Sequence, residues 1–178
     1  MTAASPALTD TPVLRTERLV LRAPEGSDWE AWCAFAMSDR SRHMGGPYSR
    51  DTAWRAFGHV IGHWAMRGFG SFVFATPEGT PLGMTGPWYP EGWPERELGW
   101  SVWAPGAEGK GLAFEAAAAA RVHAFRDLGW TTAVSYIAPA NDRSAALALR
   151  LGAVEEPGAA FPGDGPCRVF RHPRPEAA

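Results

Sequence analysis

A glycine-rich turn between an expected strand and an expected helix is the feature that most constrains this chain. Apolar and polar residues alternate over 96–103, which predicts a strand, and apolar residues at helical spacing begin at Leu112. Between them lies the run Gly106-Ala107-Glu108-Gly109-Lys110-Gly111. The first amides of a helix have no partner within it, and the helix dipole adds positive charge there, so main chain alone can bind a phosphate group. An ordinary strand-to-helix turn is the alternative.

Two better-known phosphate motifs do not fit this run. It is too short for a P-loop, and no Ser or Thr follows Lys110. It also lacks the third glycine of a dinucleotide-binding fingerprint, and a long antiparallel prelude precedes it.

A second strand-to-helix junction follows at Asn141. The β-branched and aromatic run over 132–137 predicts a strand, and Asn141 is a good N-cap for the next helix. Ser144 lies one turn into that helix and faces back toward the strand ends. An ordinary N-cap with a tolerated serine is the alternative.

The remaining pattern predicts a mixed α+β fold whose sheet is mainly antiparallel at first. Further strands are expected at 18–22, 71–75, 81–85 and 168–171, with a loop over 87–94. A capping box over 27–30 opens a helix that runs to about Met37, and another runs from Ser49 or Arg50 to Gly68. The expected buried positions of the second, third and fourth helices are Trp54, Phe57, Ile61 and Trp64; Phe114, Ala118, Val122, Phe125 and Leu128; and Leu147 and Leu151.

The composition suits one packed domain and argues against several classes of function. Among 178 residues, 46% are hydrophobic and 20% charged, and the formal net charge of −2 offers no basic surplus for nucleic acid. No apolar stretch approaches the length of a membrane span, and no secretory signal is recognisable, so we expect a cytoplasmic protein. Cys33 and Cys167 are too far apart for a cysteine-based zinc site. We expect tails at 1–12 and 173–178 around one domain at 13–172.

Together the motifs resemble the GNAT family of acyl-CoA-dependent N-acyltransferases, and most of all its branch that acetylates ribosomal-protein N-termini at alanine or serine. The segments that carry the resemblance are 16–22, 97–100, 109–116, 141–144 and 151–153. The resemblance implies a single GNAT-like domain: a mostly antiparallel central sheet, a splayed parallel strand pair and four flanking helices. It also implies that acetyl-CoA binds in the gap between the splayed strands.

The resemblance further implies which residues contact the cofactor. Backbone groups near Val102 and Trp103 would pair with the pantetheine arm, and a main-chain amide around Trp103 would stabilise the oxyanion. Asn141 and Ser144 would lie beside the pantetheine and the thioester. The pyrophosphate would bind amides of Glu108, Gly109, Lys110, Gly111, Leu112 and Ala113.

The reaction also needs a base, because an ammonium group cannot attack a thioester. Glu97 matches the position of an acidic residue often used this way in the family, and a salt bridge to Arg96 or another arginine is the alternative. The sequence departs from the family at Ala148, where the usual acid is a tyrosine, so Ser144 becomes the candidate acid. It departs again at Gly106, where Gln or Arg is common, and this would weaken pyrophosphate binding.

The expected acceptor is a primary amine, either a protein N-terminus or a small molecule. Aromatic residues near the expected acceptor site would suit a cationic amine, although large side chains pinning an irregular loop are an equal alternative. The candidates for the acceptor wall are Tyr48, Trp88, Tyr89 and Trp93. His59 and His63 lie four apart, and we expect them on a solvated helix face with no metal.

These observations predict an acetyl-CoA-dependent N-acetyltransferase. A non-catalytic acyl-CoA-binding regulatory module is the alternative, and Ala148 and Gly106 support it. A plain interaction domain is a third hypothesis, supported by the many tryptophans, which would also permit a homodimer if they form an exposed face.

Overall fold

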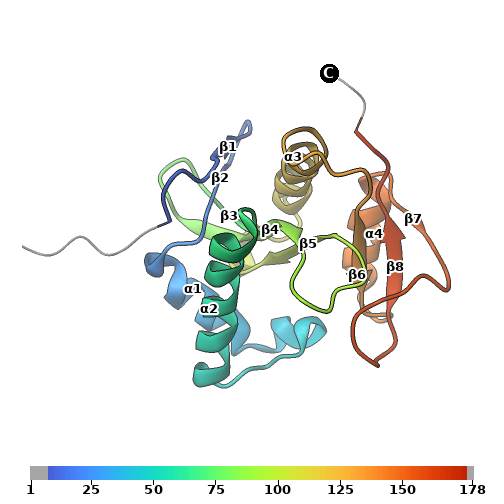
Figure 1. Cartoon of the computed structure of the whole chain (residues 1–178). Helices are drawn as coiled ribbons and strands as arrows, with labels where there is room; N and C mark the ends of the chain where they lie inside the picture. Colours follow the sequence, from blue (N-terminus) through green and yellow to red (C-terminus); the bar gives the residue numbers. More distant parts are fainter. Residues whose placement is uncertain (1–7, 176–178) are drawn as a thin grey trace, which may run out of the picture.

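An eight-stranded sheet organises the computed structural model, which describes residues 8–175 (Figure 1). The strand order is β1-β2-β3-β4-β5-β6-β8-β7, and neighbours are antiparallel except for the parallel pair β5 and β6. The strands are β1 (Leu14–Arg15), β2 (Val20–Arg22), β3 (Phe72–Ala75), β4 (Pro81–Trp88), β5 (Glu97–Val102), β6 (Val134–Ile137), β7 (Val154–Glu155) and β8 (Arg168–Arg171). The helices are α1 (Trp29–Ala36), α2 (Arg50–Arg67), α3 (Leu112–Arg126) and α4 (Asp142–Arg150), with short 3-10 helices at Gly26–Asp28, Asp39–Met44 and Pro105–Ala107.

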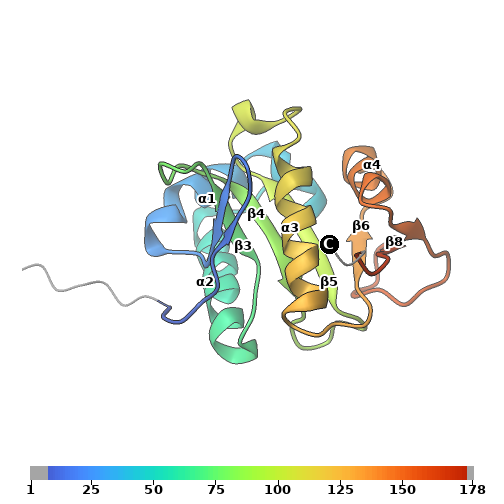
Figure 2. The ribbon, with the colours of Figure 1, turned by 90° about the horizontal axis from the view of Figure 1, so that it is seen from above.

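Helices cover both faces of the central strands. On β3, Val73 packs with α1 and α2, whereas Phe72 and Phe74 on the opposite face pack with α3. Figure 2 shows α3 on one side of the sheet and α1 and α2 on the other, with α4 beside β6 and β8. Every residue of β3 is therefore buried, as expected of a strand covered on both faces.

The predicted mixed fold is confirmed, but several element boundaries differ. The first expected strand is shorter, the short strands β1 and β7 were not anticipated, and β4 extends to Trp88 through part of the expected loop. The expected tails, 1–12 and 173–178, fall partly outside the described residues. No helix within 8–175 has the length and apolarity that crossing a bilayer requires.

The capping box expected over 27–30 is wrong, because Asp28 closes the preceding turn instead. Its carboxylate accepts a hydrogen bond from the Glu25 amide at 2.8 Å and two from the Arg22 guanidinium at 2.8 Å each. A fully buried carboxylate needs such partners. These contacts fix the 3-10 turn Gly26–Asp28, and α1 begins at Trp29.

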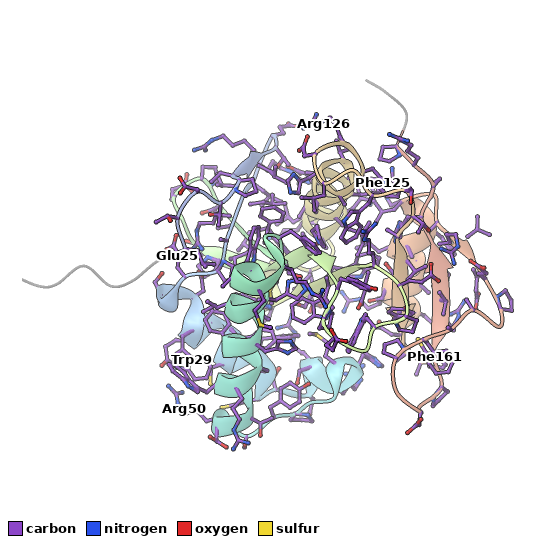
Figure 3. All side chains as sticks on the ribbon, in the orientation of Figure 1. Glu25, Trp29, Arg50, Phe125, Arg126 and Phe161 are labelled. Atoms are coloured by element: carbon purple, nitrogen blue, oxygen red, sulfur yellow. The ribbon has the colours of Figure 1, made fainter. Side chains whose placement is uncertain are left out.

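Helix α2 begins where the sequence predicts, and its buried stripe matches the prediction at Phe57 and Trp64 but not at Trp54. The Ser49 hydroxyl accepts from the Thr52 amide at 3.1 Å, and the helix ends at Gly68 with φ 73°. Trp54, predicted to be buried, is 61% exposed and meets Trp29 edge-on with 5.0 Å between ring centroids. Figure 3 shows Trp29 and Arg50 close together at the outer edge of this helix pair. The buried residues are Ala53, Phe57, Val60, His63 and Trp64.

Phe125 and Leu151 are buried as predicted, but elsewhere α3 and α4 bury mainly alanines where larger residues were predicted. Phe114, expected on the buried side of α3, instead lies under the Arg150 guanidinium, 3.9 Å from the ring centroid. Small side chains allow a helix to approach a sheet closely, so the alanine side of α3 faces the strands. Leu147 is only partly buried. The buried alanines are Ala116, Ala117, Ala120 and Ala124 of α3 and Ala145 and Ala148 of α4.

Candidate active site

The parallel strands β5 and β6 pair at one point and then separate. The Val134 amide donates to the Arg96 carbonyl at 2.9 Å, and the register pair is Glu97 with Val134. A regular parallel ladder would next join the Leu98 carbonyl to a β6 amide. Instead, the Ser135 hydroxyl donates a hydrogen bond to the Leu98 carbonyl at 2.5 Å. A side chain thus replaces the main-chain bond where the strands begin to diverge.

The gap between these strands exposes part of the β5 main chain. The Trp103 amide donates to the Leu82 carbonyl at 2.8 Å, so Trp103 pairs on the β4 side. Main-chain groups alternate sides along a strand, which directs those of Trp100 and Val102 toward β6. Val102 therefore faces the gap, where its carbonyl accepts a hydrogen bond from Arg40 at 2.8 Å. The Trp103 amide, by contrast, is already bonded and is not free to stabilise an oxyanion.

The glycine-rich turn presents free amides at the start of α3. Gly109 and Gly111 have φ values of 72° and 75°, a left-handed conformation that favours glycine. The first bond of the helix runs from the Glu115 amide to the Gly111 carbonyl at 3.0 Å. Within residues 8–175, the amides of 109–114 donate to no other group. The Glu108 amide differs from the prediction, because it donates to the Pro105 carbonyl at 3.3 Å.

A cavity of about 830 Å³ adjoins these amides. Its lining includes Gly109, Gly111, Leu112 and Ala113 of the turn, but not Lys110. Cations surround it: the lining also holds Arg40, Arg42, Arg143 and Arg150. Sequence reasoning missed these arginines, because they come from separate segments with no shared motif. Unpaired amides and guanidinium groups together fit the phosphate groups of coenzyme A.

Arg40 and Glu108 connect the walls of this first cavity. Arg40 donates to the Val102 carbonyl at 2.8 Å and to the Trp103 carbonyl at 2.5 Å, and its Nε donates to Glu108 at 3.0 Å. Arg143 donates to the other Glu108 oxygen at 2.8 Å. The two guanidinium groups hold the pKa of Glu108 below its usual value, chiefly through the Arg40 hydrogen bond. Glu108 thus contributes a carboxylate to this site, not the free amide that was expected.

A second cavity of about 440 Å³ meets the first. Trp100, Asn141 and Ser144 line both cavities, so the two cavities adjoin at these residues. Of the four predicted acceptor-wall residues, Tyr48, Trp88 and Trp93 line the second cavity. Tyr89 does not; its ring lies against the Arg67 guanidinium, 5.2 Å away.

Glu97 is the acidic side chain of this second cavity. Its Oε2 accepts a hydrogen bond from Trp93 Nε1 at 2.7 Å. Burial raises the pKa of Glu97 to about 7, and the Trp93 bond offsets only part of that effect. The alternative of a salt bridge to Arg96 is wrong, because the Arg96 guanidinium lies over the Trp130 ring at 5.5 Å. An unpaired carboxyl group with a pKa near neutrality can exchange protons at physiological pH.

Ser144 lies at the junction of the two cavities. Its amide donates to Asn141 Oδ1 at 3.2 Å, which confirms Asn141 as the N-cap of α4. Its hydroxyl oxygen accepts from Trp100 Nε1 at 3.2 Å, which leaves its own proton free to donate. One turn further, Ala148 is fully buried.

His63 does not lie on the solvated face that the sequence predicted. It is buried; its Nδ1 lies 2.9 Å from the Phe69 carbonyl, and its Nε2 accepts from the Tyr89 amide at 3.0 Å. Burial lowers its pKa, so the ring is neutral and stacks on Trp88 with 4.4 Å between centroids. Across residues 8–175, no cluster of His, Cys, Asp and Glu suits a metal ion.

Comparison with known proteins agrees with this architecture. A family model described as "Acetyltransferase (GNAT) domain" matches residues 18–154. An acetyltransferase structure from Agrobacterium tumefaciens is 38% identical, with a TM-score of 0.86 over 96% of this chain and 99% of that one.

Two ribosomal-protein acetyltransferases share the fold at lower identity. The S5-alanine enzyme of Vibrio fischeri is 16% identical, with a TM-score of 0.65 over 93% of this chain and 98% of that one. RimL, which acts on L7/L12 and was solved with coenzyme A, is 16% identical, with a TM-score of 0.72 over 90% and 97%. Since the family match spans most of the chain and the cavity fits the cofactor's phosphates, this chain belongs to the GNAT acetyltransferase family, as an acyltransferase that uses acetyl-CoA.

Proposed function

We propose that this enzyme transfers the acetyl group of acetyl-CoA to a primary amine, which attacks the thioester directly. The observation that carries the proposal is the meeting of two unlike cavities at Ser144. One is cationic and lined by free amides, and the other contains Glu97 beside aromatic rings. The first suits a phosphate-bearing acyl donor, and the second suits an amine.

Glu97 is the proposed base. An amine arrives mainly as its ammonium form and must lose a proton before its lone pair can attack. A carboxylate with a pKa of about 7 can take that proton, directly or through a water molecule, and remains largely ionised just above neutrality. The Trp93 bond fixes one carboxylate oxygen and leaves the other available.

Bound acetyl-CoA supplies the activated acetyl group, and we assign two further roles to this chain. Main-chain amides that face the gap, at Trp100 and Val102, are placed to donate to the carbonyl oxygen as negative charge develops on it. The Ser144 hydroxyl is the proposed donor to the departing sulfur. Its contribution is modest, since a thiolate is a tolerable leaving group.

A thiol-release assay with acetyl-CoA tests the proposal over a panel of small primary amines and N-terminal peptides. Calorimetry measures acetyl-CoA binding in parallel. We expect saturable binding, turnover with at least one amine, and loss of most turnover in Glu97→Gln, with the exposed Glu78→Gln as the matched control. Saturable binding without turnover over the whole panel would support the regulatory acyl-CoA-binding module instead.

A further inference from the structure

Several aromatic side chains that line the second cavity are held in place by contacts within the protein. Trp88 is stacked on His63, which is itself held by two main-chain hydrogen bonds. Trp93 is held by its bond to Glu97, and the Tyr48 hydroxyl donates to the Met44 carbonyl. The aromatic residues of the lining are Trp32, Tyr48, Trp88, Trp93, Trp100 and Tyr136. Such a preformed wall suits a flat or apolar body.

The second cavity has few side chains that can carry charge, namely Glu97 and the imidazoles of His43 and His59. Among the described residues that line it, Glu97 is the single carboxyl group, and there is no Lys or Arg. One ammonium group therefore finds one acidic partner and aromatic faces around it. A carboxylate on the acceptor would enter without a cation, and a second ammonium group would enter without a second anion. Burying an unpaired charge carries a large cost in free energy.

Two serine hydroxyls of the lining are already bonded within the protein. The Ser101 hydroxyl accepts from Trp103 Nε1 at 3.0 Å, and the Ser135 hydroxyl donates to the Leu98 carbonyl at 2.5 Å. The Ser144 proton, the Tyr136 hydroxyl and one Glu97 oxygen remain available, which is fewer groups than the successive amides of an extended peptide would need to replace their hydration. A volume of about 440 Å³ lies in the range of small-molecule sites.

We infer that the acceptor is a small monoamine with an aromatic or apolar body, taken in preference to free amino acids, polyamines and peptide N-termini. This inference rests on the proposed function and names the substrate class of the same site. Glu97 receives the amine end, and the Trp88 side of the cavity receives the body.

Matched acceptors test the inference through kcat/KM in the thiol-release assay. Phenylalanine is 2-phenylethylamine with one added carboxylate, ethylamine lacks the ring, and spermidine and an alanine-initiated peptide represent the other classes. We expect 2-phenylethylamine to exceed phenylalanine by about 100-fold or more, the cost of an unpaired buried charge. We expect it to exceed ethylamine by about tenfold or more, the effect of burying the ring.

A charge-introducing variant tests the cause of the preference. His59 lies on the exposed side of α2 and lines the second cavity, so His59→Arg places a cation there with little risk to folding. It should raise the kcat/KM of phenylalanine relative to 2-phenylethylamine by about tenfold, the effect of giving the carboxylate a charged partner, while His59→Gln should not. Equal or better turnover of phenylalanine, spermidine or the peptide by the unsubstituted enzyme would overturn the inference and leave the proposed function standing. No turnover with any amine would overturn the proposed function itself.

Discussion

Replacing Glu97 with glutamine tests the electrostatics of the active site apart from its chemistry. Glutamine has the shape of a protonated glutamate and keeps an oxygen that can accept the Trp93 bond. It cannot ionise. Glu97→Gln therefore removes the cost of placing a negative charge in this cavity, and it removes the proposed base at the same time. We expect the variant to be more stable and less active than the unsubstituted enzyme.

The magnitude follows from the pKa of about 7 for Glu97, against an ordinary value of 4.5. Because the folded state holds this proton more tightly than the unfolded state, the free energy of unfolding falls as pH rises from 4.5 to about 7 and is then level. Each pKa unit corresponds to about 1.4 kcal/mol. The variant should gain about 1 kcal/mol over the unsubstituted enzyme at pH 5 and about 3 kcal/mol at pH 8.

Urea denaturation at pH 5, 6, 7 and 8 measures this difference. Glu78→Gln is the control, because Glu78 is exposed and should leave the free energy of unfolding unchanged at every pH. A stability difference between Glu97→Gln and the unsubstituted enzyme that does not grow between pH 5 and pH 8 would refute a raised pKa. The assignment of Glu97 as a base near neutrality would then lose its physical basis.

The pH dependence of kcat/KM measures the ionisation of Glu97 independently of the stability measurements. Turnover of the unsubstituted enzyme should rise with pH up to about 7 as Glu97 ionises. Glu97→Gln should be slower and lack that rise. An identical pH profile in both proteins would assign the rise to another group.

Three further substitutions address the cofactor side. Ser144→Ala should lower kcat by up to about tenfold and leave acetyl-CoA affinity by calorimetry unchanged; equal losses in both would indicate a binding role. Glu108→Gln removes the carboxylate that Arg40 holds beside the first cavity, so the calorimetric Kd for coenzyme A should fall about fivefold, whereas weaker binding would show that Glu108 orders the site. Ser135→Ala leaves the Leu98 carbonyl without its hydrogen bond and should lower the free energy of unfolding, measured by urea denaturation, by about 1–2 kcal/mol. An unchanged free energy of unfolding would show that the Ser135 hydrogen bond does not stabilise the point where β5 and β6 separate.

The features of this protein that could be predicted from the sequence are those that depend on residues adjacent in the chain. The Gly109-Lys110-Gly111 turn, the start of α2 at Arg50 and the Asn141 cap follow from local backbone preferences, and the structure has all three. These same features place the free amides and Ser144. A short stretch of sequence could therefore locate the cofactor side of the site.

Burial was harder to predict, because it depends on what a helix packs against. In α2, the buried stripe runs through Ala53 and Phe57 and leaves Trp54 exposed. His63 was assigned to solvent for the same reason, although its two main-chain partners make it a buried support for Trp88. Hydrophobicity alone does not set the phase of an amphipathic helix.

The arginines of the first cavity show a second reason why part of the site could not be predicted from the sequence. Arg40 lies 68 residues from Glu108, and Arg143 lies 35 residues beyond it, yet both guanidinium groups meet at that one carboxylate. No local pattern connects them, and the low overall charge of −2 conceals a cationic cavity. Arginine and glutamate cancel in the sum, so the net charge of the whole chain does not reveal a local group of guanidinium side chains.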